Sequence, residues 1–203
     1  MLKNIIKNKL GQSLIELIVA VFIIEIGLLS VWSLFLSNFN AEYEAELRIV
    51  GANLSREGIE LVKNIRDSNW LRADYGYINE KGEIWPWDEG LAPGVYSISY
   101  DNLKLDDLTD YDNSQLYIDS QGFYTNSSIG TKISPYKRIV ELKSVCCSDT
   151  NGDLICDDTN YQIKESGEIC SLRIGIDVIV TTTWFNNGLK RSSVVEDIIY
   201  NWR

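Results

Sequence analysis

Histidine is absent from all 203 residues of the chain. Its absence removes the side chain that most often acts as a general base near neutral pH, the Ser–His–Asp and Cys–His forms of nucleophilic catalysis, and histidine ligands for zinc. The sequence also has no Gly-rich phosphate loop and no nucleophile elbow. These absences argue against an enzyme.

Basic residues are scarce after the first 36 positions. The chain carries 19 Lys and Arg against 29 Asp and Glu, a net charge of −10. Residues 1–36 have a net charge of +1 and residues 37–203 have a net charge of −11. A body this acidic repels the phosphates of nucleic acid. We therefore expect no direct binding of nucleic acid.

What the sequence has in abundance is a long apolar run near the N-terminus. From Leu14 to Leu36 the clearly polar residues are Glu16, Glu25 and two serines, and the run is long enough to cross a bilayer core of ~30 Å as a helix. Lysines precede it and glutamates follow it, so the positive-inside rule places the N-terminus in the cytoplasm and the body outside. An ordinary secretory signal is cut after a shorter apolar stretch, whereas here the small residue, Gly11, comes before the run.

The residues around Gly11 resemble the class III signal of type IV prepilins and type II secretion pseudopilins. In that pattern a Gly precedes the cut, four residues follow, and a Glu precedes a continuous apolar helix; this chain has Gly11, then Gln12 to Ile15, then Glu16. The resemblance implies cleavage between Gly11 and Gln12 by a prepilin peptidase, followed by N-methylation. It also implies that Glu16 pairs with the N-terminal amine of a neighbouring subunit, because a buried carboxylate and a buried ammonium are tolerable only together.

Two residues depart from the family pattern. Gln12 stands where the family usually has Phe, and a free N-terminal Gln can cyclise and lose its charge unless methylation comes first. Glu25 is a second carboxylate in the apolar run, and on a helix it projects from the face opposite to Glu16. Glu25 is therefore either protonated or reaching for the membrane surface, or it is hydrogen-bonded to another subunit.

The remaining pattern predicts an α+β fold, with one long N-terminal helix packed on a C-terminal antiparallel β-sheet, as in pilin-like proteins. We divide the chain into a basic leader (1–11), a transmembrane or filament-core helix (12–36), an amphipathic continuation (37–67) and a β-rich head (68–203). An aromatic loop over 68–94 opens the head. Strands are predicted at 94–100, 115–119, 122–125, 137–145, 172–185 and 189–200, with Asn187-Gly188 as a hairpin turn between the last two.

Four cysteines lie close together in the head, at Cys146, Cys147, Cys156 and Cys170. Their even number behind a membrane segment suits an oxidising exterior and two disulfides. Zinc is the alternative, although the spacing lacks a paired C-x-x-C. Adjacent cysteines would form a strained bridge, so Cys146 and Cys147 are each expected to pair with Cys156 or Cys170.

The segment between the cysteines resembles a calcium loop, because oxygen-bearing residues fall at alternate positions. The match is partial, since Leu154 stands where a second Gly is usual and Asn160 replaces the bidentate Glu. The alternative is a polar turn held by disulfides, and calcium is the one cofactor that the sequence suggests. The candidate ligands are the side chains of Asp149, Asn151, Asp153 and Asp157 and the carbonyl oxygen of Ile155.

Taken together, these features predict a structural subunit, a minor pilin or pseudopilin, of a type IV pilus-like filament. Its expected partners are the prepilin peptidase/methyltransferase, other pilin subunits with their assembly platform, and the membrane. It would start as a single-pass protein of the cytoplasmic membrane and end in a cell-surface or periplasmic filament. The alternative is a membrane-anchored extracellular binding or adhesion protein that does not polymerise. Glu16 favours the filament, because a plain anchor needs only apolar residues.

Overall fold

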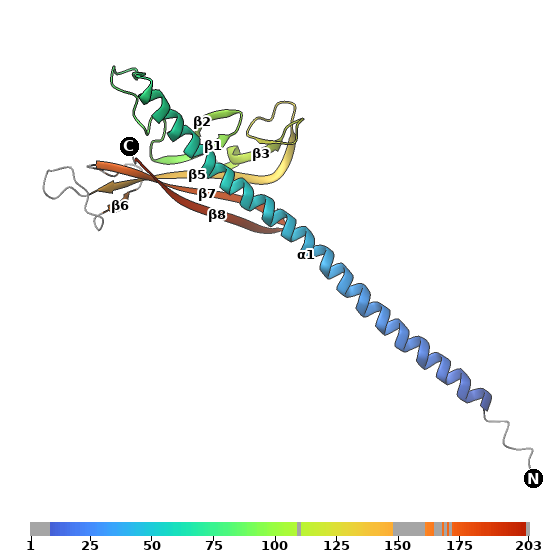
Figure 1. Ribbon diagram of the computed structural model, residues 1–203. Helices are drawn as coiled ribbons and strands as arrows, with labels where there is room; N and C mark the ends of the chain where they lie inside the picture. The colour runs from blue at the N-terminus through green and yellow to red at the C-terminus, as the bar shows by residue number, and fades with distance from the viewer. Residues whose placement is uncertain are drawn as a thin grey trace, which may run out of the picture. The chain divides into compact units, whose positions relative to one another are not determined.

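The computed structural model describes residues 9–108, 111–147, 161–164, 168, 170 and 172–201, with the backbone alone for 9–13 and 112 (Figure 1). The chain divides into two compact units, Met1–Glu46 and Leu47–Arg203, which we describe separately. Helix α1 (Lys9–Asp74) contributes to both.

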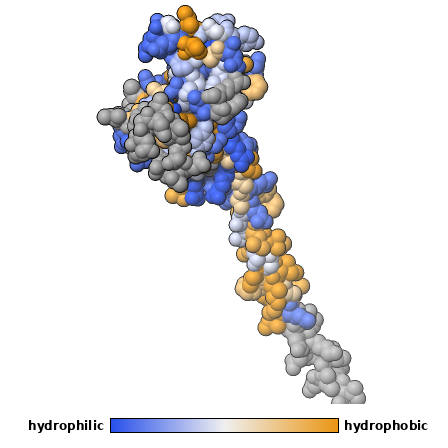
Figure 2. Space-filling model, turned by 60° about the vertical axis from the view of Figure 1, so that its left-hand side comes forward, coloured by the Kyte–Doolittle hydropathy of each residue, from blue (hydrophilic) through white to orange (hydrophobic). Residues whose placement is uncertain are grey.

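The first unit consists of the N-terminal part of α1. Its large apolar side chains, from Leu14 to Phe39, are between 47% and 69% exposed, and this stretch is mostly orange in the hydropathy view of Figure 2. Within the described residues, α1 is the one helix long and apolar enough to cross a membrane. The predicted membrane-spanning segment is therefore present as a candidate, by length and composition.

In the second unit α1 is amphipathic and packs on the sheet. Its buried residues include Leu54, Ile59 and Val62, which recur at helical spacing. Two glycines on this face let the helix backbone approach closely: a Cβ at Gly51 would lie 2.6 Å from the Trp184 ring, and one at Gly58 would lie 2.7 Å from a methyl carbon of Val180.

The helix ends later than predicted, at Asp74 instead of 67. Residues 68–74 contain polar residues typical of a loop, but Asn69 and Trp70 are buried, so packing extends the helix past its local signal. The end is made by Gly76, whose φ of 74° suits the left-handed cap. The amide of Gly76 donates to Ala73 O at 3.0 Å and the next amide donates to Arg72 O at 3.0 Å.

The head contains an antiparallel sheet with strand order β2-β1-β5-β3-β4, in which β6 and β7 also pair with β5, and β8 pairs with β7. All of these pairings are antiparallel, so the predicted α+β fold of a helix on an antiparallel sheet is confirmed. The elements are β1 (Gly94–Ser99), β2 (Asn102–Asp107), the short helix η1 (Tyr111–Ser114), β3 (Gln115–Ile118), β4 (Tyr124–Thr125), β5 (Lys132–Cys147), β6 (Tyr161–Lys164), β7 (Leu172–Asn186) and β8 (Leu189–Tyr200).

The β7–β8 hairpin is formed as the Asn-Gly pair predicts. Asn186 pairs with Leu189, which leaves a two-residue turn in which Asn187 has φ 50° and Gly188 has φ 76°. Positive φ at both positions is the requirement of the type I′ turn.

Strand β5 is longer than predicted and continues through Pro135, which has no N–H to donate. The neighbouring strand compensates with a side chain. The amide nitrogen of Gln115 donates to Ser134 O at 2.8 Å and to Tyr136 O at 3.0 Å. The β3–β5 register shifts at the same place.

Helix and sheet enclose one large apolar core and a smaller one. The large core joins residues such as Val62 of α1 to β5 and β7, and the smaller one contains Leu54, Tyr136 and Trp184. Arg138 of β5 is also buried: it donates to Leu54 O at 3.1 Å and Ile98 O at 2.7 Å. Burial lowers its pKa, and the Glu57 carboxylate at 3.2 Å opposes that shift.

Candidate functional site

The predicted processing residues Gly11 and Gln12 lie in the backbone of α1, which begins two residues earlier at Lys9. Five residues separate Gly11 from Glu16, a rise of ~7.5 Å along the helix. The proposed cut and the carboxylate therefore belong to the same helical segment.

Glu16 is exposed in the first unit and makes no hydrogen bond or ion pair with the rest of the described chain. Its neighbours in sequence, Ile15 and Leu17, are each 65% exposed. A carboxylate in a helix of apolar side chains costs roughly 2.5–3.5 kcal/mol to place at membrane depth. If Glu16 lies at membrane depth, a partner for its carboxylate would therefore have to come from outside the described residues.

Glu25 is also exposed and, within the described part of the chain, without a polar partner. It lies nine residues after Glu16, which at 100° per residue places the two on opposite sides of the helix. One partner group cannot serve both carboxylates. The two explanations offered above for Glu25 stay open.

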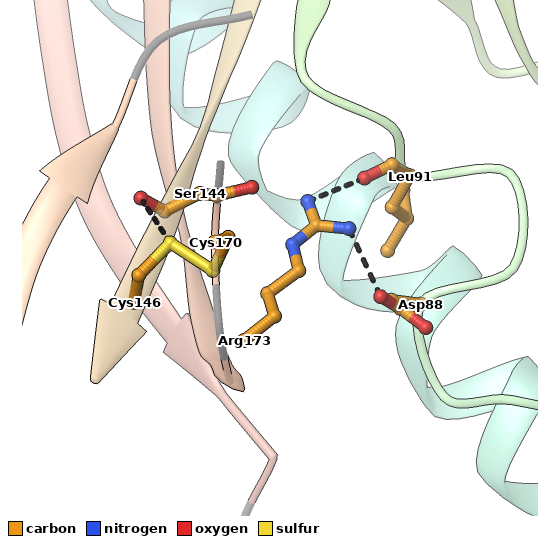
Figure 3. The surroundings of a disulfide bond; sticks show 6 residues. All are labelled: Asp88, Leu91, Ser144, Cys146, Cys170 and Arg173. Carbon is orange, nitrogen blue, oxygen red and sulfur yellow. Dashed lines mark hydrogen bonds and ion pairs between the residues drawn. A yellow bond between two sulfur atoms is a disulfide. The ribbon is translucent and has the colours of Figure 1, made fainter. Parts of the chain in front are cut away.

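The cysteine region contains a disulfide between Cys146, near the end of β5, and Cys170, just before β7, with Cα atoms 5.5 Å apart (Figure 3). This is one of the pairings that the sequence allows. Cys147 is disulfide-bonded as well, whereas Cys156 lies outside the described residues. The zinc alternative is wrong for this region, because a sulfur in a disulfide is not a thiolate ligand.

Arg173 ties the disulfide region to the loop that follows α1 (Figure 3). Its guanidinium donates to Asp88 Oδ2 at 2.9 Å and to Leu91 O at 2.6 Å. Burial lowers the pKa of Arg173, and the nearby Asp88 carboxylate opposes this shift. Sequence reasoning missed this contact, because Arg173 and Asp88 are far apart in the chain.

Buried Asn69 holds the same loop from the side of α1. Its amide nitrogen donates to Trp87 O at 3.1 Å and Glu89 O at 2.9 Å, and its amide oxygen accepts from Trp85 Nε1 at 3.0 Å. The aromatic loop is therefore packed and hydrogen-bonded. No local pattern marks Asn69 for this role.

The predicted calcium ligands Asp149, Asn151, Asp153, Ile155 and Asp157 lie outside the described residues. Among the residues that are described, no group of three or more acidic or cysteine side chains is placed to hold a metal ion. The calcium loop stays a prediction.

A basic pocket of about 340 Å³, unforeseen in the sequence, lies where the β7–β8 hairpin meets α1. Beside it, the ammonium groups of Lys137 and Lys190 lie 5.2 Å and 4.8 Å from the centre of the Tyr111 ring. Its lining residues come from three separate parts of the chain, so no sequence motif could reveal it. They are Arg48, Trp184, Lys190, Arg191 and Ser192.

Trp184 is 1% exposed, and its Nε1–H is buried without an acceptor within the described structure. The opposite edge of its ring faces α1, since a Cβ at Gly51 would meet Cζ3 at 2.6 Å and Cε3 at 3.0 Å. The indole nitrogen therefore points away from that helix contact. A buried donor without an acceptor costs about 1–3 kcal/mol.

Comparisons of the chain with protein-family models, characterised proteins and solved structures found no match. Arguments about function therefore rest on the chain's own residues: the apolar helix with its carboxylates, the disulfide-linked head and the basic pocket.

Proposed function

We propose that the protein is a type IV pilin-like subunit, most like a minor pilin or pseudopilin, made as a membrane-anchored precursor and assembled into a filament. The observation that carries the proposal is Glu16, an exposed carboxylate with no polar partner among the described residues, in a helix of exposed apolar side chains. Gly11, one turn and a half earlier, supplies the expected cleavage position.

The apolar surface of the first unit requires a cover. Each fully covered Leu, Ile or Phe side chain contributes roughly 1.5–3 kcal/mol. The 18 exposed large apolar side chains from Leu14 to Phe39 therefore represent a large driving force for insertion or assembly. A bilayer covers the apolar side chains but leaves Glu16 without a partner. Helices of neighbouring subunits can cover both the apolar surface and the carboxylate.

Cleavage after Gly11 would create a partner suited to Glu16. The new terminus is a cation at the start of a helix, where the helix dipole already places partial positive charge. A carboxylate from the adjacent subunit neutralises that charge, and each group lowers the desolvation cost of the other. Methylation of the amine keeps Gln12 from cyclising and so preserves the pair.

The head supports this proposal without deciding it. A helix packed on an antiparallel sheet is the arrangement expected for a pilin-like protein, but a fold alone does not define a function. The disulfide between Cys146 and Cys170 suits the predicted location of the head outside the cytoplasm.

Processing is tested by co-expression with a prepilin peptidase and intact-mass analysis. The expected product lacks residues 1–11 and begins at Gln12, and Gly11→Ala abolishes the cut. Gly27→Ala is the matched control, because it changes another glycine of the same helix where a Cβ meets nothing within 4 Å. A cut after the apolar run, or no cut at all, contradicts the proposal.

Assembly is tested by comparing Glu16→Ala with Glu25→Ala. Loss of one member of a buried charge pair costs ~3–5 kcal/mol, so Glu16→Ala should insert into membranes normally but be depleted from filaments at least tenfold. Glu25→Ala should have a smaller effect. If both variants assemble like the wild type, the protein is better explained as an anchored binding or adhesion protein that does not polymerise.

A further inference from the structure

A second pocket of the head, of about 360 Å³, lies on the face of the sheet that is turned away from α1. Ile98 of β1 and Leu116 of β3 point to the other face, where they are buried in the two cores. Side chains alternate between the faces of a strand, so Ser97 and Tyr117 project into this pocket instead. Asp106 of β2 pairs directly with Ser97 and joins them there. We call this hollow the polar pocket.

The polar pocket is lined by hydrogen-bonding groups that the fold leaves free. The side chains of five lining residues make no hydrogen bond or ion pair within the described chain. Ser97 is only 7% exposed, yet its hydroxyl oxygen is not enclosed by the protein. Buried polar groups normally have a partner, so these groups are available to a ligand. The five residues are Ser97, Asp106, Asn113, Tyr117 and Ser128.

The wall of the polar pocket, by contrast, is held in place by hydrogen bonds. The amide nitrogen of Gln115 donates to the carbonyl oxygens of Leu116, Ser134 and Tyr136 at 2.8, 2.8 and 3.0 Å. The amide nitrogen of the Asn126 side chain is enclosed and belongs to this wall. A pocket whose wall is already ordered loses little conformational entropy when a ligand binds.

The backbone that carries Ser128 is tied down as well. The Ser127 amide donates to the Thr125 hydroxyl at 3.1 Å, and that hydroxyl donates to Asp101 Oδ2 at 2.9 Å. The Asn126 amide donates to the Ser99 hydroxyl of β1 at 3.4 Å. The segment is therefore fixed against the strand that supplies Ser97.

The charge of the polar pocket restricts the ligand class. Asp106 is the one charged residue among the described residues that line it, so phosphate, sulfate and other anions would be repelled. A hard cation such as calcium takes six to eight oxygen ligands close to the ion, and no group of three acidic or cysteine side chains is placed to hold a metal among the described residues. An uncharged polar ligand remains.

We propose that the polar pocket binds a short uncharged saccharide. Each sugar hydroxyl both donates and accepts, which matches a carboxylate that only accepts, an amide that does both, and the hydroxyls of Ser97 and Ser128. Tyr117 adds an aromatic ring beside its hydroxyl, and the ring can cover the apolar C–H face of a sugar. The volume is at the small end of the ~300–1,000 Å³ typical of ligand sites, which suits a short saccharide.

This inference concerns the head alone. It requires neither cleavage after Gly11 nor assembly through Glu16, because every residue of the polar pocket lies in the second unit. Loss of saccharide binding and loss of filament assembly are therefore separate outcomes.

The first experiment measures binding of the fluorescently labelled full-length chain to immobilised oligosaccharides. The detergent must lack a sugar headgroup, because a maltoside or glucoside would compete for the pocket. Neutral oligosaccharides ending in glucose, galactose, mannose, N-acetylglucosamine or fucose are compared with sialylated and sulfated ones. We expect binding to at least one neutral oligosaccharide and none to the acidic ones.

Asp106→Ala should weaken that binding at least tenfold, because hydrogen bonds to a charged acceptor are the strong ones. The matched control is Asp107→Ala. It removes an exposed carboxylate from the next position of β2, which projects from the opposite face of the sheet, and it should bind like the wild type. Binding to no neutral oligosaccharide, or equal binding by Asp106→Ala and the wild type, would overturn the proposal.

The second experiment observes the polar pocket directly and does not depend on the folding of Asp106→Ala. The eleven tyrosines of the full chain are labelled with ¹³C in the ring, and Tyr117→Phe, which removes a hydroxyl without a partner in the described chain, assigns the Tyr117 signal. The neutral oligosaccharide that binds best should shift this signal saturably, whereas calcium chloride and sodium sulfate at equal concentration should not. An unmoved Tyr117 signal, or the same shift with calcium or sulfate, would show that the proposal is wrong.

Discussion

The apolar side chains of the two units differ in exposure: many are buried in the head, whereas those of the first unit are exposed. In the head, Val62, Val140 and Val178 are 0% exposed because helix and sheet cover each other. In the first unit, Leu29 is 69% exposed, although it belongs to the same helix as Val62. The stability of the head is therefore encoded within the chain, whereas the first unit depends on a cover supplied by lipid or by other molecules.

The polar side chains of the two units differ in whether they have hydrogen-bond partners. Buried Ser55 lies 2.8 Å from the Thr182 hydroxyl, and buried Arg138 is held by two carbonyls and Glu57. Glu16 has no such partner among the described residues. Ser55 and Arg138 are therefore satisfied by the fold of the head, whereas a partner for Glu16 at membrane depth would have to come from outside the described residues.

The largest expected effect comes from changing the same residue type in both units. Trp184→Ala should lower the free energy of unfolding of the head by ~3–5 kcal/mol, because it leaves a cavity in the smaller core. Trp32→Ala, at a position 61% exposed in the first unit, should leave it within ~0.5 kcal/mol. Denaturant unfolding of the full chain in detergent, followed by circular dichroism, measures both. Equal losses would show that the two units unfold together.

Removing the disulfide tests whether the stability of the head is separate from membrane insertion. Cys146→Ser/Cys170→Ser opens a bridge between residues 24 apart and should cost ~2–4 kcal/mol of head stability. Resistance of the chain to alkaline extraction from membranes should not change, since it depends on the apolar helix. If extraction changes as much as unfolding does, the comparison between the units fails.

The features predicted from sequence are those with a local signal. The apolar run is continuous, and the Asn187-Gly188 turn needs only its two residues. Strand β2 was missed because its residues are mostly exposed and partly charged, so alternation is absent. Strand β6 was missed because it is only four residues long. Both strands are specified by pairing with a partner, to β1 and β5 respectively.

The residues of the candidate site also differ in whether a local sequence signal reveals them. Gly11 and Glu16 could be identified because their spacing lies within six consecutive residues. The basic pocket could not, because Arg48 and Lys190 meet only after α1 packs on the hairpin. Packing against distant residues likewise extends α1 past 67, which no local propensity requires.

A smaller effect is expected from adding one methyl group to a glycine in each unit. Gly51→Ala places a Cβ 2.6 Å from the Trp184 ring, a clash worth ~1–3 kcal/mol, partly offset by the ~1 kcal/mol helix preference of Ala over Gly. We expect a net loss of ~1 kcal/mol in head stability. Gly27→Ala meets nothing within 4 Å and should cause no loss. A stabilised Gly51→Ala variant would mean that the helix can move away from the sheet without cost.

The smallest expected effect concerns Asp177, a buried carboxylate of β7 whose Oδ1 has no hydrogen-bond partner in the described chain. Burial raises its pKa, the Glu196 carboxylate raises it further, and Lys143 opposes the shift. Because the folded state binds this proton more tightly than the unfolded state, the penalty is absent below the ordinary pKa of ~3.9 and grows as the pH rises through the folded-state value. Asp177→Asn should therefore stabilise the head by roughly 1 kcal/mol at about pH 7 and by almost nothing at about pH 3.

Asp197→Asn in β8 is the matched control of opposite sign, because it removes an ion pair to Lys63 at 2.9 Å and should cost ~0.5–1 kcal/mol at about pH 7. Melting temperatures of both variants at the two pH values decide the matter: a gain for Asp177→Asn that does not change with pH would show that its charge is not the source of the penalty.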